Sequence, residues 1–137
     1  PSVSTTRNII PVGLNAKGEM AVPSGDTMDV GWYSKGTLPG NVGSAVLDAH
    51  VFAAFSKLKG VAVGDDLYVK DRSGKTLHFV VRSAKTYLLS DMGLDVRNFL
   101  FNKADGRYLN LITCAGTLTA DRSTYTHRLV IHAELVQ

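Results

Sequence analysis

Short apolar runs separated by turn-forming residues are the feature that most restricts how this chain can fold. Seven such runs are present: Asn8–Leu14, Val30–Tyr33, Ser44–His50, Asp66–Lys70, Thr76–Tyr87, Tyr108–Cys114 and Arg128–Val136. Between them stand turn signals such as Asn15–Gly18, Pro39–Asn41 and Asp71–Gly74. Gly, Pro, Asn and Asp favour tight turns and break strands. Seven or eight short strands joined in this way are typical of an all-β sandwich or barrel.

The final run has the clearest two-residue period. Its odd positions are apolar, and they alternate with a more polar set: Leu129, Ile131, Ala133 and Leu135 against Arg128, Val130, His132 and Glu134. Successive strand residues point to opposite faces. We therefore predict that the first set faces the core and that the second is half exposed. His78 and His132 are both expected on exposed strand faces.

Helical signals are confined to two segments. Val51–Leu58 is long enough for about two turns. Asp95–Asn102 predicts a second helix, with Asp95 as its N-cap and with Val96, Phe99 and Leu100 facing inward. The expected architecture is therefore all-β with one or two short helices.

Length and charge restrict the function classes. A chain of 137 residues corresponds to a single domain, residues 1–137, that can bury a core without disulfides. The net charge of +3 is scattered, without basic runs interleaved with aromatics, which argues against nucleic-acid binding. No segment has the roughly 18 apolar residues of a membrane span, and no signal peptide opens the chain. Because the chain begins at Pro1 and not at Met, we expect any anchoring segment to precede it.

The only cysteine, Cys114, ends an apolar run. One thiol excludes an intrachain disulfide and a Cys-rich metal site. A lone cysteine is ordinarily a small buried core residue. It becomes a nucleophile only as a thiolate or beside a base, usually a histidine, and a nearby cation favours the thiolate.

Two further residues at strand ends provide a base and a cation. His50 ends the run that begins at Ser44, and Arg128 begins the last run. Side chains at strand ends emerge at a rim, so His50, Cys114 and Arg128 are predicted to meet at one edge of a barrel. Taken alone, the residues leave two alternatives open. His50 can be a strand-end histidine bonded to a loop, and Arg128 can form a weak surface ion pair with Glu134 or Asp121.

His127 is the natural competitor of His50 as a base. It adjoins Arg128 and points the opposite way in an extended chain, so we interpret it as a loop residue. Asp91, Asp95 and Asp105 lie in the long connection before the cysteine strand, but three separated carboxylates do not establish a calcium site. No cofactor is therefore expected.

The segment Leu111–Cys114 resembles the T-L-x-T-C signature of sortases, the cysteine transpeptidases of Gram-positive cell surfaces, with Asn110 in place of the first Thr. Gly43–His50 resembles the family's strand leading to its catalytic histidine. Arg128 lies where the family has its arginine, at the start of the final strand. The gaps of 64 residues from His50 to Cys114 and of 14 from Cys114 to Arg128 are also similar to those of the family.

The resemblance extends over essentially the whole chain. Three N-terminal stretches are similar to the actinobacterial-type sortases of classes E and F: Pro11–Leu14, Met20–Pro23 and Val30–Tyr33. One departure is Ala49, where many members have glycine. Asp48 precedes it and shares a strand face with His50, where its carboxylate either tunes the imidazole or is simply solvated.

The resemblance implies a closed β-barrel of about eight strands and an acyl-transfer reaction. Cys114 would attack the Thr–Gly carbonyl of an L-P-x-T-G-like sorting signal and form a thioester, which an amine of a peptidoglycan precursor or a pilin lysine then resolves. His50 would act as general acid and base, and Arg128 would hold the substrate and stabilise the oxyanion. Thr113 is expected in the pocket wall beside the thiol, with packing as the alternative.

The resemblance also implies partners and a location. The partners would be surface proteins with a C-terminal sorting signal and the acceptor amine, at the outer face of a Gram-positive plasma membrane, with an N-terminal anchor. Two rival hypotheses remain: a cysteine peptidase that transfers its acyl group to water, and a non-catalytic β-barrel binding module. The S-H-G-C-I-R pattern of L,D-transpeptidases is missing around Cys114.

Overall fold

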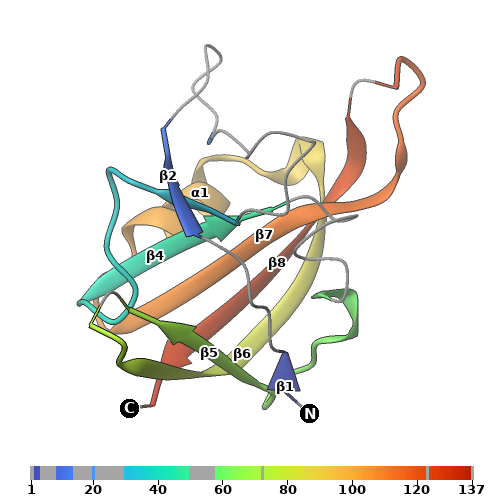
Figure 1. The fold of residues 1–137 in the computed structure, drawn as a ribbon. Helices are drawn as coiled ribbons and strands as arrows, with labels where there is room; N and C mark the ends of the chain where they lie inside the picture. The colour runs from blue at the N-terminus through green and yellow to red at the C-terminus, as the bar shows by residue number, and fades with distance from the viewer. Residues whose placement is uncertain are drawn as a thin grey trace.

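The computed structural model describes residues 2–3, 9–13, 20, 30–49, 58–71, 73–122 and 124–136. Within them lie eight strands, drawn in Figure 1: β1 (Ser2–Val3), β2 (Ile9–Val12), β3 (Val30–Tyr33), β4 (Gly43–Asp48), β5 (Asp66–Lys70), β6 (Thr76–Leu88), β7 (Arg107–Leu118) and β8 (Tyr125–Leu135). The helical elements are the 3₁₀ turns η1 (Leu58–Gly60) and η2 (Leu89–Asp91) and the helix α1 (Leu94–Asn102). None of the helices in the described part has the length and apolarity needed to span a bilayer.

All eight strands belong to one mixed sheet in the order β1-β5-β6-β8-β7-β4-β3-β2. The long strands β6, β7 and β8 pair antiparallel, whereas β4 runs parallel to β7. Figure 1 shows that this sheet is strongly curled, with α1 beside β4. The predicted all-β barrel is confirmed. Among the described pairings the sheet ends at β1 and β2, which are not paired with each other.

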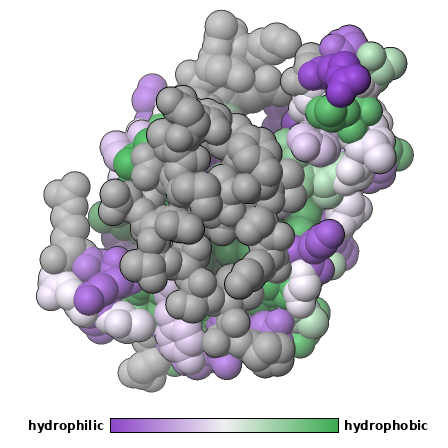
Figure 2. Space-filling model, turned by 45° about the vertical axis from the view of Figure 1, so that its right-hand side comes forward, coloured by the Kyte–Doolittle hydropathy of each residue, from purple (hydrophilic) through white to green (hydrophobic). Residues whose placement is uncertain are grey.

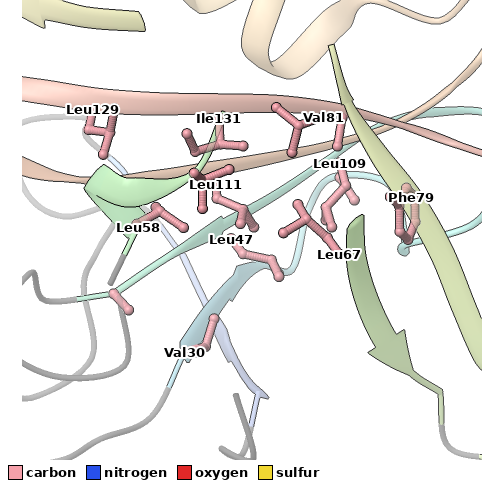
Figure 3. Packing of buried hydrophobic residues seen from close by; sticks show 14 of the residues in the cluster. Val30, Leu47, Leu58, Leu67, Phe79, Val81, Leu109, Leu111, Leu129 and Ile131 are labelled. Atoms are coloured by element: carbon pink, nitrogen blue, oxygen red, sulfur yellow. The ribbon is translucent and has the colours of Figure 1, made fainter. Parts of the chain in front are cut away.

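The concave side of the sheet holds the core. Leu129, Ile131 and Ala133 of β8 are buried there, as the alternation predicted, and Leu135 packs against them. Strands β4, β6 and β7 contribute the same kind of alternating apolar positions: Ala45, Leu47, Leu77, Phe79, Val81, Leu109 and Leu111. Figure 3 shows Leu47, Val81, Leu109, Leu111 and Ile131 gathered between these strands. This packing fixes which side chains remain on the outer face of the sheet.

The outer face of β8 is covered as well, so the expectation of a half-exposed second set is wrong for Val130 and His132. His132 is only 6% exposed, because its ring lies 4.5 Å from that of Phe99 and 5.0 Å from that of Tyr108. Phe99 belongs to α1, which packs on this face. An alternating pattern shows which side of a strand is more apolar, but not what covers the other side. His78 is half-buried beside Asp66.

Helix α1 begins one residue earlier than predicted, at Leu94, with Gly93 as its N-cap. Asp95 is therefore not the cap. It lies in the first turn, where its negative charge interacts favourably with the positive end of the helix dipole. Leu100 is buried as expected, whereas Phe99 keeps part of its ring exposed. Of the other predicted helix only Leu58 is described, as the buried first residue of η1; residues 51–57 lie outside the described ones.

Polar and apolar residues are interspersed over the described part of the face in Figure 2. This agrees with the scattered charge of the sequence.

Candidate active site

The structure brings Cys114 and Arg128 together. Strands β7 and β8 pair antiparallel, and in their register Cys114 lies directly opposite Arg128. Directly paired residues point to the same side of a sheet, which here is the outer face. The predicted meeting of thiol and guanidinium is therefore present. His50 lies outside the described residues, which end at Ala49 on this part of the chain.

The guanidinium of Arg128 is held in place by the start of its own strand. Its Nη1 donates to the carbonyl oxygens of Tyr125, at 3.1 Å, and His127, at 2.9 Å. Its Nη2 donates to Oγ1 of Thr124 at 2.8 Å. Glu134, one of the two surface partners that the sequence left open, instead accepts a bond from Arg82. All three acceptors are neutral, so Arg128 carries a fixed positive charge next to the sulfur.

The Cys114 thiol is half-buried, and this burial is the main reason that its pKa is raised. The positive charge of Arg128 lowers the same pKa, and the negative charge of Asp48 raises it. Burial prevails over the favourable cation, so the thiol keeps its proton at neutral pH. A reaction at this sulfur therefore requires a base to remove the proton.

Asp48 is the site residue whose environment the sequence did not reveal. It ends β4 and pairs with Ile112 of β7, two residues before Cys114, so both side chains lie on the outer face. It is only 6% exposed, and within the described part of the chain its Oδ1 is a buried oxygen without a hydrogen-bond partner. Burial raises the pKa of this carboxyl to about 8, against a smaller lowering by a backbone hydrogen bond. The alternative of a solvated Asp48 is therefore wrong.

Thr113 lies on the core side of β7, opposite to its neighbour Cys114. It is buried, and its Oγ1 donates to the carbonyl oxygen of Ala49 at 2.7 Å. The amide of Ala49 in turn donates to the carbonyl oxygen of Ile112. These bonds tie the end of β4 to β7 immediately beside the cysteine. They favour the packing alternative for Thr113, while its role in a pocket wall stays a prediction.

His127 lies in β8 and not in a loop, so that interpretation is wrong. It pairs with Ala115 of β7, and its Nδ1 is 2.7 Å from Oγ1 of Thr126. The adjoining Gly116 has a φ of 78°, and a Cβ there would lie 2.5 Å from Nδ1 of His127. Only glycine permits this backbone and this close approach. Gly116, two residues after Cys114, therefore allows the backbone of β7 to lie close to the side chains of Thr126 and His127 in β8.

Asn110 departs from the sortase signature, and the structure gives a reason for its presence. Its side-chain amide donates to the carbonyl oxygen of Leu100 at 2.8 Å. Its Oδ1 therefore accepts from Nδ1 of His132, at 2.6 Å, which assigns the histidine tautomer from the network. A further bond, from Ser44 to the carbonyl oxygen of Lys103, holds the end of the helix on β4. Together these bonds fix α1 on the outer face that carries Cys114.

Metal binding has no support from side-chain clusters in the described part of the chain, which holds no group of three His, Cys, Asp or Glu suited to an ion. Asp105 accepts bonds from Lys103 and Tyr108. Asp91 and Asp95, the other carboxylates of this connection, are exposed.

Comparisons with known proteins agree with this geometry. A sequence-family model described as the sortase domain matches residues 1–136. Among solved structures, sortase A from Corynebacterium diphtheriae is 24% identical with a TM-score of 0.62, covering 79% of this chain and 48% of that one. Sortase C from Clostridium perfringens SM101 is also 24% identical, with a TM-score of 0.63 and coverages of 83% and 59%. A lid mutant of the C. diphtheriae enzyme is 21% identical, with a TM-score of 0.66 and coverages of 92% and 68%.

The comparison with curated proteins found no match. The chain spans about half the length of the first two sortase structures, and at these identities the likeness concerns the fold. The family model, in contrast, extends over nearly the whole chain and includes Cys114 and Arg128. The chain belongs to the sortase family.

Proposed function

We propose that this chain is the catalytic domain of a cysteine transpeptidase, which cleaves an LPxTG-like sorting signal between Thr and Gly and transfers the acyl part to an amine. The observation that carries the proposal is the direct pairing of Cys114 with Arg128 on β7 and β8. A nucleophile and a fixed cation side by side suit acyl transfer, in which negative charge develops on the carbonyl oxygen.

The reaction has two steps that use the same groups. In the first, the Cys114 sulfur attacks the Thr carbonyl carbon, the amide C–N bond breaks, and the leaving amine receives a proton. In the second, an incoming amine attacks the thioester, loses a proton and releases the thiol. His50 is the proposed acid and base, because the pKa of the thiol is raised and its proton must be taken up. Arg128 stabilises the oxyanion of both tetrahedral intermediates.

The proposed donors are surface proteins with a C-terminal sorting signal, and the acceptor is an amine of a peptidoglycan precursor or a pilin. The enzyme would work at the outer face of the plasma membrane, anchored through a segment N-terminal to this chain. The family membership supports this setting. A class E- or F-like specificity is proposed on the N-terminal stretches Pro11–Leu14 and Val30–Tyr33.

The test is a peptide with a fluorophore and a quencher on either side of an LPxTG sequence, incubated with and without a primary amine. We expect cleavage, a thioester on Cys114 detectable by mass spectrometry, and a product that contains the amine. Cleavage without any amine-containing product would identify a hydrolase. The absence of both cleavage and thioester for any sorting peptide would support a binding module.

Three variants separate the roles of the residues. Cys114→Ala is expected to abolish turnover while leaving the fold, because a small side chain replaces a small one. Arg128→Lys is expected to lose most activity, since a point charge does not reproduce the guanidinium fork. His50→Ala should abolish turnover, whereas the matched control His78→Ala should retain it, because His78 lies on β6 beside Asp66. A fully active Arg128→Lys protein would contradict the oxyanion role.

A further inference from the structure

The carboxyl of Asp48 is a buried ionisable group on the face of the proposed nucleophile. Side chains on the outer face of β4, β7 and β8 form rows across the strands, as the register defines them. Cys114 and Arg128 form one row, and Asp48, Ile112 and Val130 form the next. Asp48 therefore stands one row from the sulfur, between it and the part of the face that α1 covers.

The Asp48 carboxyl has a backbone hydrogen bond, but one of its two oxygens has no partner in the described part of the chain. Its Oδ1 is inaccessible to solvent and accepts no hydrogen bond from any described residue. Burying a carboxyl in this way is unfavourable for folding. Arg128, a cation on this face, donates its described hydrogen bonds to Thr124, Tyr125 and His127. A costly group beside a reactive one suggests a role in the chemistry.

The other ionisable groups around Asp48 can be named element by element. Among the described residues, the outer face presents Tyr33 from β3, Tyr108 and Cys114 from β7, and Arg128, His132 and Glu134 from β8. The charged residues within α1 are the exposed Asp95 and Arg97. The charge of Asp48 raises the pKa of Cys114. The charges that act on the pKa of His132 are instead those of Lys103, Glu134 and Asp105. Of these two described groups, the charge of Asp48 therefore acts on the thiol and not on His132.

We propose that Asp48 is a positioning residue that controls how readily the Cys114 thiol loses its proton. With a protonated carboxyl, the charge of Arg128 favours the thiolate without opposition from Asp48. With an ionised carboxyl, a negative charge one row away opposes the thiolate. The Cys114 thiol therefore loses its proton most readily while Asp48 is neutral.

The order in which Asp48 and Cys114 ionise determines the pH range in which this effect appears. Burial raises the pKa of Asp48 to about 8, and the pKa of Cys114 is raised above 9.0. The carboxyl thus ionises first, and the thiol loses its proton against an existing negative charge. Two coupled groups of this kind give a titration that is spread over a wider pH range than a single one.

The experiment measures the rate of Cys114 alkylation by iodoacetamide from pH 6 to pH 10 in wild-type protein and in Asp48→Asn. Below pH 7 the two rates are expected to agree, because both side chains at position 48 are then neutral. Between pH 8 and pH 10 the Asn variant should react roughly threefold to tenfold faster, the effect of a neighbouring charge that moves a pKa by half a unit to one unit. Its profile should also follow a single ionisation.

Glu134→Gln is the matched control, because Glu134 is a carboxylate on the same face of β8 that pairs with Arg82. Its profile should coincide with that of the wild type. Superimposed profiles for wild type and Asp48→Asn would overturn the inference. A constant ratio at every pH would also overturn it, because altered access to the sulfur would explain such a change. An equal displacement in Glu134→Gln would reduce the effect to general surface charge and overturn it too.

This inference rests on the proposed function only in naming Cys114 as the nucleophile. Iodoacetamide requires no peptide substrate, so the alkylation profile is obtained whether or not the thiol transfers a peptide. If no peptide is cleaved but the alkylation profiles of wild type and Asp48→Asn differ as expected, only the proposed function is overturned. Turnover of the peptide with superimposed profiles would overturn only the role of Asp48.

Discussion

Replacement of Asp48 by asparagine is expected to stabilise the protein in a way that depends on pH. The folded state raises the pKa of this carboxyl from its ordinary value of 3.8 to about 8. Between these two values the unfolded chain is ionised at position 48 while the folded chain is protonated. The unfolded state therefore binds fewer protons, and the wild type loses stability as the pH rises through this interval. Asparagine has nearly the same shape and does not ionise.

The size of the effect follows from the interval that the pH crosses. Each pH unit between the two pKa values changes the free energy of unfolding by about 1.4 kcal/mol. From pH 4 to pH 7 the Asn variant should thus gain about 3–4 kcal/mol relative to the wild type. The gain should stop growing once the pH exceeds about 8, where the folded carboxyl is ionised as well. Such a gain is large beside the 5–15 kcal/mol that stabilises a typical domain.

The assay is urea unfolding of both proteins at pH 4, 5, 6, 7 and 8, because the pH dependence of every other group cancels in the difference. Asp71→Asn is the control of opposite sign. A hydrogen bond from Ser73 is the main cause that lowers the pKa of this exposed carboxyl. Asp71→Asn should therefore become less stable relative to the wild type as the pH rises through the range in which Asp71 ionises. A difference between wild type and Asp48→Asn that changes by less than about 1 kcal/mol over this range would refute the reasoning about burial.

Three further predictions concern the surroundings of the thiol. Thr113→Val keeps the shape of the side chain but leaves the Ala49 carbonyl without its bond, so it should cost about 1–3 kcal/mol in urea unfolding and lower peptide turnover; unchanged values in both assays would contradict the tie between β4 and β7. Asn110→Ala leaves the Leu100 carbonyl unpaired, so hydrogen exchange of the α1 amides should speed up, and unaltered exchange would show that this bond does not hold the helix. Gly116→Ala forces a Cβ against Thr126 and His127 at a positive φ, so its melting temperature should fall by several degrees, whereas an unchanged value would mean that the hairpin adapts.

The strand pattern could be predicted because it depends on local chemistry. Residues Val30–Tyr33 and Asp66–Lys70 form strands with the predicted bounds, and β8 buries Leu129 and Ile131 as its alternation required. The prediction failed for His132, because its burial comes from Phe99 on a helix far away in the sequence. It also failed for the cap of α1, where Gly93 and not Asp95 occupies the position. Caps and coverings depend on the path of the backbone, which side-chain type alone does not determine.

For the candidate site, the sequence by itself determined the chemical groups, one thiol and one guanidinium, and their separation along the chain. The prediction that Arg128 begins the last strand is wrong, because β8 begins at Tyr125. The tertiary structure alone decided that Cys114 and Arg128 lie opposite each other, because strand register is set by the packing of a whole sheet face against the core. It also decided that Asp48 is buried beside them. A carboxyl looks the same in any sequence, whereas its charge state depends on the neighbours that exclude water from it, and only the folded chain assembles those neighbours.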